Sequence, residues 1–221
     1  MKTGHAYARA AMALIAAGVT LSACGFKLPG SGPAPDIYDL SPKSSFDETL
    51  PRVDLQLVVE EPSSARGIDT DRVALRPRPL EIKYFAGARW VDRGPRMVQI
   101  LLVESFENTG KIVSVGRQSI GLRPDFSVKS ELREFQAEYT EANALPNIHV
   151  RLNVKLIKMP EARIVASRTF DQIEPSSGKE ITAIVQSFDE TLGKVMRGAV
   201  EWTLRETDAR AKAAARESAR E

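Results

Sequence analysis

The sequence is poor in cysteine and histidine, the side chains that most often bind metals or act as nucleophiles and bases. Its 221 residues include one cysteine, Cys24, and two histidines, His5 and His149. A tetrahedral zinc site, a Cys–His pair and a Ser–His–Asp triad need more of these side chains than one folded domain would hold here. We therefore expect no metal site and no catalytic residue based on His or Cys.

Carboxylates are the remaining candidates for catalysis, and Asp69, Asp71 and Asp92 lie near predicted loops. Carboxylates in loops are commonly solvated or cap helices, so we do not assign them a catalytic role. The three Gly-Lys pairs have neither a Gly five residues earlier nor a following Ser or Thr, so a Walker A loop is also lacking. These absences predict a protein that is not an enzyme and has no cofactor.

An excess of positive charge is lacking as well. Lys2 and Arg9 lie in an N-terminal segment that we expect to be removed, which leaves 29 Lys and Arg residues against 29 Asp and Glu residues. Nucleic-acid-binding domains usually carry a basic stripe. We therefore expect no nucleic-acid partner.

The N-terminus has the pattern of a secretory signal peptide. Lys2 and Arg9 precede an apolar run, residues 10–21, which contains no Asp, Glu, Lys or Arg. This run is shorter than the roughly 20 apolar residues that a membrane-spanning helix needs. We predict a signal peptide over residues 1–23.

The end of this run, Leu21-Ser22-Ala23-Cys24, resembles the lipobox of bacterial lipoproteins. The resemblance implies cleavage between Ala23 and Cys24 and lipid on the Cys24 thiol, which would also remove a lone free thiol from an oxidising compartment. A plain signal peptide, or a small buried cysteine, is the alternative. Gly25 stands where Asp would favour retention in the inner membrane, so the resemblance implies the periplasmic face of the outer membrane, with the inner membrane as the less favoured location.

Three regions follow the signal peptide. Residues 24–35 are rich in Gly and Pro, which is typical of a flexible tether. Residues 36–206 contain the periodic apolar patterns and are predicted to form one folded domain. Residues 207–221 are rich in Ala, Arg and Glu without an apolar face, and we predict a frayed or disordered tail.

Alternation of apolar and polar residues predicts several strands in the folded region. The clearest pattern runs from Asn147 to Lys158 and places His149 on the polar face. Helical spacing of apolar residues predicts one helix that opens around Pro95 and ends at Gly110, and a second that starts after Gly178. The sum is an α/β (α+β) domain in which two helices cover one face of a largely antiparallel sheet. The other predicted strands cover residues 53–59, 72–75, 81–85, 111–115, 131–140 and 162–173.

Several segments, in this order behind a lipobox, resemble the ABC-type transport auxiliary lipoprotein family, and its PqiC-type branch in particular. The likeness covers roughly Ile37 to Trp202, and its most visible signature is Arg89-Trp90. The other matching segments are Tyr38-Asp39-Leu40, Leu57 to Pro62, Gly67 to Ala74, Glu81 to Phe85, Phe170 and Phe188-Asp189.

The resemblance implies a non-catalytic adaptor in a system that moves lipid between membranes. Its expected partners are an MCE (mammalian cell entry) domain protein and, through it, an ABC permease and ATPase. Because MCE proteins form rings, we also expect a ring of copies of this chain. Arg89 and Trp90 are candidates for partner contact, although Trp90 as part of the core is the favoured interpretation.

Two other functions stay open from the sequence. The domain could itself carry lipid in an apolar pocket between helices and sheet. It could also serve another envelope assembly machine, which would share the anchor and the lack of catalytic groups.

Overall fold

The computed structural model describes residues 33–117, 123–140 and 145–220. The predicted signal peptide, Ala23, Cys24, Gly25 and nearly all of the tether lie outside these residues. Residues Pro35–Glu221 form one compact unit, and the described hydrophobic core lies entirely within it. A unit with its own core is expected to fold without the N-terminal segment.

Three long strands form the centre of the sheet: β7 (Phe126–Glu138), β8 (Asn147–Lys158) and β9 (Arg163–Pro175). They pair in antiparallel fashion, with β8 between the other two. These ladders contain most of the paired residues, so the prediction of a largely antiparallel sheet is confirmed. The bounds of β8 are those that its alternating pattern predicts.

The shorter strands add parallel pairings that the sequence did not reveal. Strand β2 (Val53–Val59) runs parallel to both β7 and β6 (Ile112–Arg117). Strand β4 (Arg72–Arg78) pairs with β7 in parallel and with β5 (Glu81–Trp90) in antiparallel fashion. The two-residue period of a strand predicts its faces but not its neighbours. The remaining short strands are β1 (Asp36–Tyr38), parallel to β5, and β3 (Ser63–Ser64), parallel to β7.

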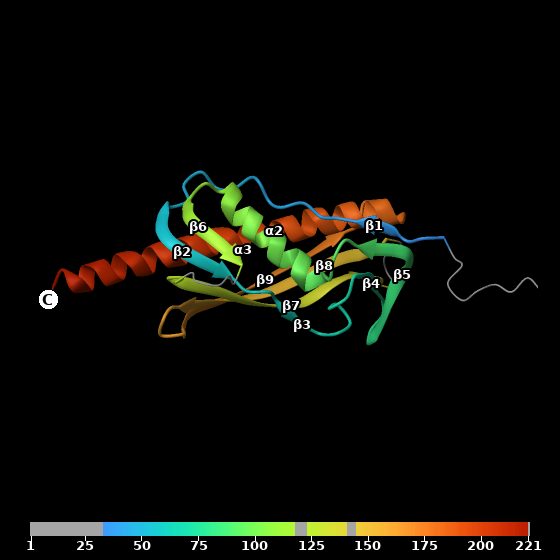
Figure 1. Ribbon diagram of the computed structural model, residues 1–221. Coiled ribbons are helices and arrows are strands. Elements are labelled where there is room, and N and C mark those ends of the chain that lie inside the picture. The colour runs from blue at the N-terminus through green and yellow to red at the C-terminus, as the bar shows by residue number, and fades with distance from the viewer. Residues whose placement is uncertain (1–32, 118–122, 141–144, 221) are drawn as a thin grey trace, which may run out of the picture. The chain divides into compact units, whose positions relative to one another are not determined.

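Two helices are present in the described residues, α2 (Gly94–Asn108) and α3 (Ile181–Ser218), and both lie on the same side of the sheet (Figure 1). Each buries the apolar stripe that its spacing predicts. The single-domain α+β fold with helices on one face is therefore confirmed. The buried stripes are Val98, Leu101, Leu102 and Phe106 on α2, and Ile184, Phe188, Leu192, Val195, Met196 and Ala199 on α3.

The prediction of a disordered tail over residues 207–221 was wrong for the part that the structure describes, because α3 continues to Ser218. Ala, Arg, Lys and Glu are strong helix formers, and extending a formed helix avoids the cost of nucleation. Pairs one turn apart also support this segment: Arg210 contacts Glu206 at 3.0 Å and Lys212 contacts Asp208 at 2.7 Å. The lack of a broad apolar face indicates little burial, which does not prevent helix formation.

Three aromatic rings join the sheet to α3 near the start of α2. Trp90 is only 3 % exposed, and its ring lies 5.6 Å from Phe135 of β7 and 5.2 Å from Phe188 of α3. The Phe135 and Phe188 rings are themselves 5.2 Å apart and meet edge to face. Such pairs add to the free energy of burying the rings.

We predict that Trp90→Ala lowers the free energy of unfolding by about 3–5 kcal/mol, the range for truncating a buried aromatic side chain. Urea unfolding of the Pro35–Glu221 unit measures this loss. Trp202→Ala is the matched control, because Trp202 is half-buried and contacts Phe170 with ring centroids 5.9 Å apart. Equal losses in the two variants would contradict the central role of Trp90.

Candidate functional site

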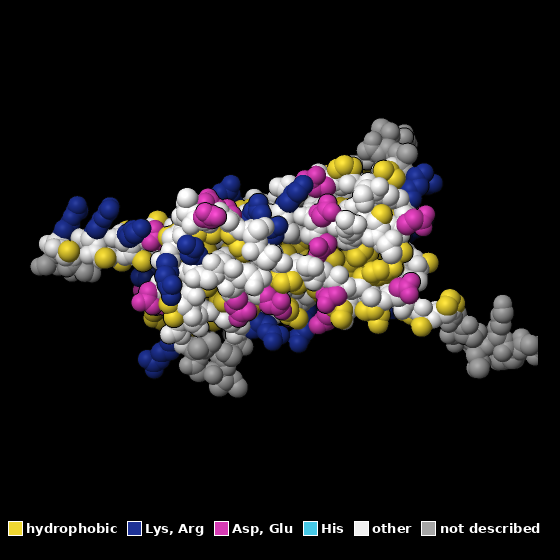
Figure 2. All heavy atoms as spheres, turned by 90° about the horizontal axis from the view of Figure 1, so that it is seen from above, with side chains coloured by type: hydrophobic (Ala, Val, Ile, Leu, Met, Phe, Trp, Pro, Cys, Tyr) yellow, Lys and Arg dark blue, Asp and Glu magenta, His cyan; other side chains and the backbone are white. Residues whose placement is uncertain are grey.

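The two faces of the domain differ in their charge pattern. Figure 2 views the helical side and shows acidic and basic side chains interspersed, with apolar side chains between them. The opposite face of the sheet has no helix over it in Figure 1 and carries the alternate, polar residues of β8. One connected set of charged side chains lies there, which we call the open-face network: Arg76, Glu134, Gln136, Glu138, His149, Arg151 and Asp171.

A bulge in β7 turns the acidic residues of this strand toward the open face. Leu132 and Phe135 are both buried although they are three residues apart, because the pairing with β8 shifts between Leu132 and Glu134. One extra residue reverses which side chains face outward. After the bulge, Glu134 and Glu138 point away from the core together with Gln136.

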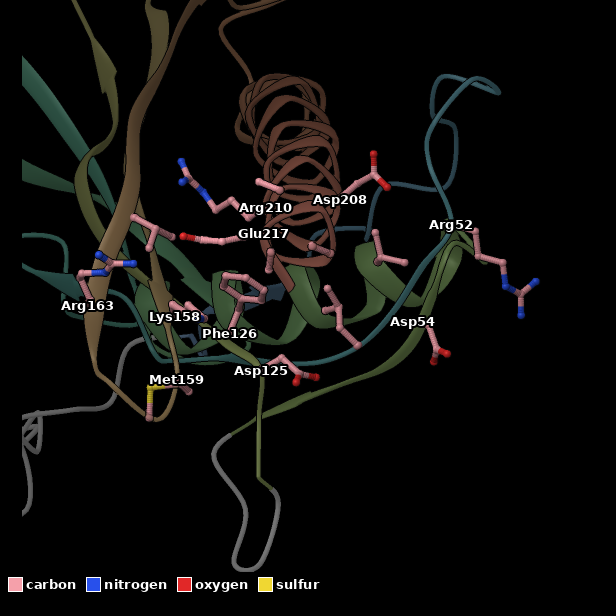
Figure 3. A pocket seen from close by; sticks show the side chains of 16 residues that line it. Arg52, Asp54, Asp125, Phe126, Lys158, Met159, Arg163, Asp208, Arg210 and Glu217 are labelled. Carbon is pink, nitrogen blue, oxygen red and sulfur yellow. The ribbon is translucent and has the colours of Figure 1, made fainter. Parts of the chain in front are cut away.

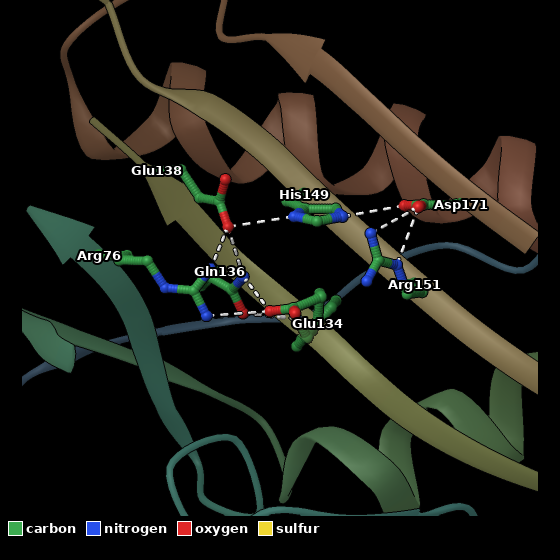
Figure 4. A network of polar contacts seen from close by, with 8 residues as sticks. Arg76, Glu134, Gln136, Glu138, His149, Arg151 and Asp171 are labelled. Carbon is green, nitrogen blue, oxygen red and sulfur yellow. Dashed lines mark hydrogen bonds and ion pairs between the residues drawn. The ribbon is translucent and has the colours of Figure 1, made fainter. Parts of the chain in front are cut away.

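His149 lies at the centre of the open-face network (Figure 4). Its Nδ1 is 3.0 Å from Oε1 of Glu138 and its Nε2 is 2.8 Å from Oδ1 of Asp171. The side chain is only 7 % exposed. A neutral imidazole has one N–H, whereas the imidazolium has two, so only the protonated ring can donate to both carboxylates.

Two arginines complete the open-face network. Arg76 donates to Glu138 at 2.6 Å and to Glu134 at 3.0 Å, and Arg151 contacts Asp171 at 2.7 Å. Gln136 donates through Nε2 to Glu134 at 2.6 Å and to Glu138 at 2.8 Å. With His149 protonated, three positive and three negative groups balance, and they link β4, β7, β8 and β9.

The network shifts the acidity of its own members. Burial alone would raise the pKa of Glu138, but hydrogen bonds from Gln136 and His149, together with the charges of His149 and Arg76, lower it below its ordinary value. Asp171 follows the same pattern: burial raises its pKa, and the contacts with Arg151 and His149 outweigh this and lower it. Its hydrogen bond to Asp171 raises the pKa of Arg151. The arrangement therefore favours the charged forms.

Glu134, Glu138 and His149 form the one group in the described part of the chain whose ligand atoms could surround a metal ion, with all of them within 4.8 Å of one another. However, the guanidinium of Arg76 already contacts both carboxylates, and Gln136 donates to the same two groups. A metal ion bound there would have to displace the guanidinium of Arg76 from both carboxylates. We assign these residues to an ion-pair network.

Of the residues that the sequence analysis considered for partner contact or catalysis, one lies in the core and the others form ion pairs at the surface. Trp90 lies in the core, as its favoured interpretation predicted, whereas Arg89 is on the surface and contacts Asp71 at 2.6 Å. Asp92 contacts Arg96 at 2.8 Å, and Asp69 forms an ion pair with Arg93. Each of the three loop carboxylates is thus paired with an arginine.

His149 differs in part from its sequence-based description. It lies on the polar face of β8, as predicted, but it is buried and paired with two carboxylates, which the pattern of β8 alone does not indicate. Its partners come from β7 and β9, so they could be found only from the strand register. The three-residue spacing of Leu132 and Phe135 is the one local signal of the bulge that directs Glu138 outward.

The comparisons with known proteins agree with this fold. A model of the ABC-type transport auxiliary lipoprotein component family matches residues 38–199. The chain belongs to this family. The match contains the whole open-face network and Trp90, and it ends before the last turns of α3.

Two solved structures resemble this auxiliary lipoprotein. A Xanthomonas campestris protein of family DUF330 is 33 % identical, with a TM-score of 0.76, over 80 % of this chain and 99 % of that one. A second, uncharacterised protein is 11 % identical, with a TM-score of 0.60, over 76 % of this chain and 97 % of that one, and shows the shared fold only.

A curated relative is an uncharacterised protein of Bradyrhizobium diazoefficiens, 25 % identical over 180 residues. The alignment covers 80 % of this auxiliary lipoprotein but 48 % of that protein, so the chain spans about half the length of the curated relative it matches. Among the described residues, no helix is long and apolar enough to cross a membrane.

We predict that the auxiliary lipoprotein domain loses stability in acid through the open-face network. Carboxylates with a lowered folded-state pKa add stability that is complete above their unfolded pKa, about 4, and that is lost as the pH falls through the folded-state pKa. The free energy of unfolding should therefore drop below about pH 4. Urea unfolding at a series of pH values measures this drop.

The matched variant for this measurement is Asp171→Asn, which removes one of the two carboxylates of the open-face network whose pKa is lowered. The acid-induced loss should become smaller than in the unaltered domain. An identical pH profile in both proteins would contradict a contribution from Asp171.

Proposed function

We propose that this chain is a lipid-anchored periplasmic lipoprotein that acts as a non-catalytic docking component of an MCE-type lipid transport system. The observation that carries the proposal is the match of residues 38–199 to a family of transport auxiliary lipoproteins. The matched region follows an N-terminal segment that resembles a lipobox and ends in Cys24.

The proposed anchor is a diacylglyceryl group and an N-acyl chain on Cys24, after cleavage behind Ala23. Each buried methylene contributes about 0.8 kcal/mol to membrane binding. One acyl chain therefore binds a membrane only marginally, whereas several chains together anchor the protein stably. The Gly25 that follows supports the outer membrane as the destination. The folded domain then needs no membrane-binding surface of its own.

We predict that Cys24→Ser abolishes lipid attachment, because the serine hydroxyl cannot form the thioether. Metabolic labelling with a fatty acid and fractionation of the membranes measure this result: the variant should carry no label and leave the outer-membrane fraction. Ser22→Ala is the control, since it keeps a small residue before the cleavage site and should be labelled normally. An unlabelled wild-type protein would contradict the anchor.

The proposed docking role favours several copies in one ring. A lipid anchor holds the copies in one plane, and a Gly- and Pro-rich tether lets each domain reorient above it. Each contact with a ring-shaped MCE partner then raises the effective concentration for the next contact. Weak single contacts can add up to stable docking in this way.

We predict that the lipoprotein forms a ring, alone or with its MCE partner, through surfaces of the domain before residue 207. Mass photometry of the detergent-solubilised protein measures its assembly. Deleting residues 211–221 should leave the assembly intact, because this deletion keeps Thr207, which is buried, and removes residues 211–217, which are exposed, with the few that follow. A protein that stays monomeric both alone and with its partner would exclude the ring.

A further inference from the structure

A groove of about 570 Å³ lies between the last turns of α3 and the end of the sheet (Figure 3). Its walls come from β2, the start of β7, the turn between β8 and β9, and α3 between Asp208 and Glu217. The volume is within the usual range for a small-molecule site. The part of the wall that α3 contributes lies beyond residue 199, where the family match ends, whereas the rest of the wall lies within the match.

This groove is not the apolar pocket between helices and sheet that the sequence analysis considered as an alternative. Between α2, the first part of α3 and the sheet, close-packed side chains such as Phe106, Leu152 and Leu192 fill the space. Farther along α3, the residues at positions 210, 213, 214 and 217 recur at helical spacing and face the groove. Because two of these are alanines, the helix does not fill the space beneath it.

The floor of the groove is apolar. Val53 and Leu55 of β2 and Phe126 of β7 line it and are buried, and Val165 of β9 joins them. A peptide placed on this floor would lose hydration of its backbone amides without gaining partners from these side chains. An acyl chain has no polar groups to satisfy and gains from the burial of its methylenes.

One side of the groove is positively charged. Figure 3 shows Lys158, Arg163 and Arg210 on the side toward β9, with Glu217 as the carboxylate among them. Arg210 contacts Glu206 at 3.0 Å through Nη2, but its Nε is buried and has no hydrogen-bond acceptor among the described residues. Lys158 contacts Glu161 at 3.4 Å, and the charge of Arg163 also acts on this carboxylate, although Arg163 forms no salt bridge within the described part of the chain. A buried donor without a partner is uncommon in folded proteins.

On the other side of the groove the charges are of both signs, and Arg52, Asp54 and Asp208 point outward in Figure 3. Asp125 accepts a hydrogen bond from the Gln56 backbone N–H at 2.7 Å. Among the lining residues, the excess of basic over acidic side chains is thus confined to the β9 side.

We propose that this groove binds an amphiphile with an acyl chain and an anionic head group, either carboxylate or phosphate. The chain lies along Phe126, Leu55 and the alanines of α3, and the head group accepts hydrogen bonds from the guanidinium groups of Arg163 and Arg210. Guanidinium groups bind both kinds of anion well. This site does not depend on the proposed docking role, because it requires no partner protein.

The test is a fluorescence titration of the Pro35–Glu221 unit with dansyl-labelled undecanoic acid. The acid should bind saturably to one site per chain. Ala211 also lines the groove. Ala211→Trp should weaken binding by about tenfold or more, because an indole in the groove removes the space for the chain. Ala209→Trp is the matched control on the same helix, since Ala209 is exposed and does not line the groove. It should bind the acid like the unaltered protein.

Head-group recognition is tested with Arg163→Gln combined with Arg210→Gln. This variant should bind the acid about tenfold more weakly, the loss expected for charge-assisted hydrogen bonds. It should bind the uncharged methyl ester of the same probe as the unaltered protein does. Arg216→Gln, on exposed helix outside the groove lining, is the control. Equal loss for acid and ester would overturn the assignment of the head-group site.

Native mass spectrometry separates the two kinds of head group. After incubation with phosphatidylglycerol vesicles or with palmitate, a bound phospholipid supports the phosphate form and a bound fatty acid supports the carboxylate form. Absence of both, together with probe binding that does not saturate, would overturn the proposal. A co-purifying peptide that competes with the probe would also overturn it. None of these results depends on whether the ring or the MCE complex forms.

Discussion

The apolar stripe of α3 lies across the inward side of β8, and the two-residue alternation of that strand determines what each face of the domain can hold. Ile148, Val150, Leu152, Val154 and Leu156 point toward the helices and are buried. His149 and Arg151 must then point to the opposite face. A shift of one residue in register would exchange these sets and place charge in the core, which would be strongly destabilising.

This constraint explains why the open-face network is so fully paired. His149 is nearly covered by its neighbours although no helix lies over it, so its ring nitrogens have lost water and need protein partners. Glu138 and Asp171 supply them from the strands on either side. A buried ion pair often adds little stability compared with apolar residues of the same size, but breaking one is costly. The network therefore resists slippage among three strands whose polar face offers few apolar contacts.

The sequence predicted the features that depend on local pattern and missed those that depend on partners far along the chain. The bounds of β8, the apolar stripes of both helices and the core position of Trp90 follow from periodicity and from the size of the side chains. The parallel pairing of β2 with β6 and β7 has no local signal. The contacts of His149 with Glu138 and Asp171 also bridge separations of 11 and 22 residues, and one of them depends on the bulge in β7.

The prediction of a disordered tail, where the last turns of α3 lie, was wrong for a different reason. An apolar face is the usual sign that a helix packs against the core. Here α3 leaves the core with Thr207 and continues on helix propensity and ion pairs, presenting alanines and Arg210 to the end of the sheet. Weak packing and a formed helix together leave an apolar groove open, which a well-packed helix would have closed. The same small side chains that led to the prediction of disorder therefore leave the space of the groove, and they lie in a part of the chain that the shared family region does not include. Because the proposed docking role requires only the domain before these turns, the proposed ligand site and the proposed docking surface can be altered separately.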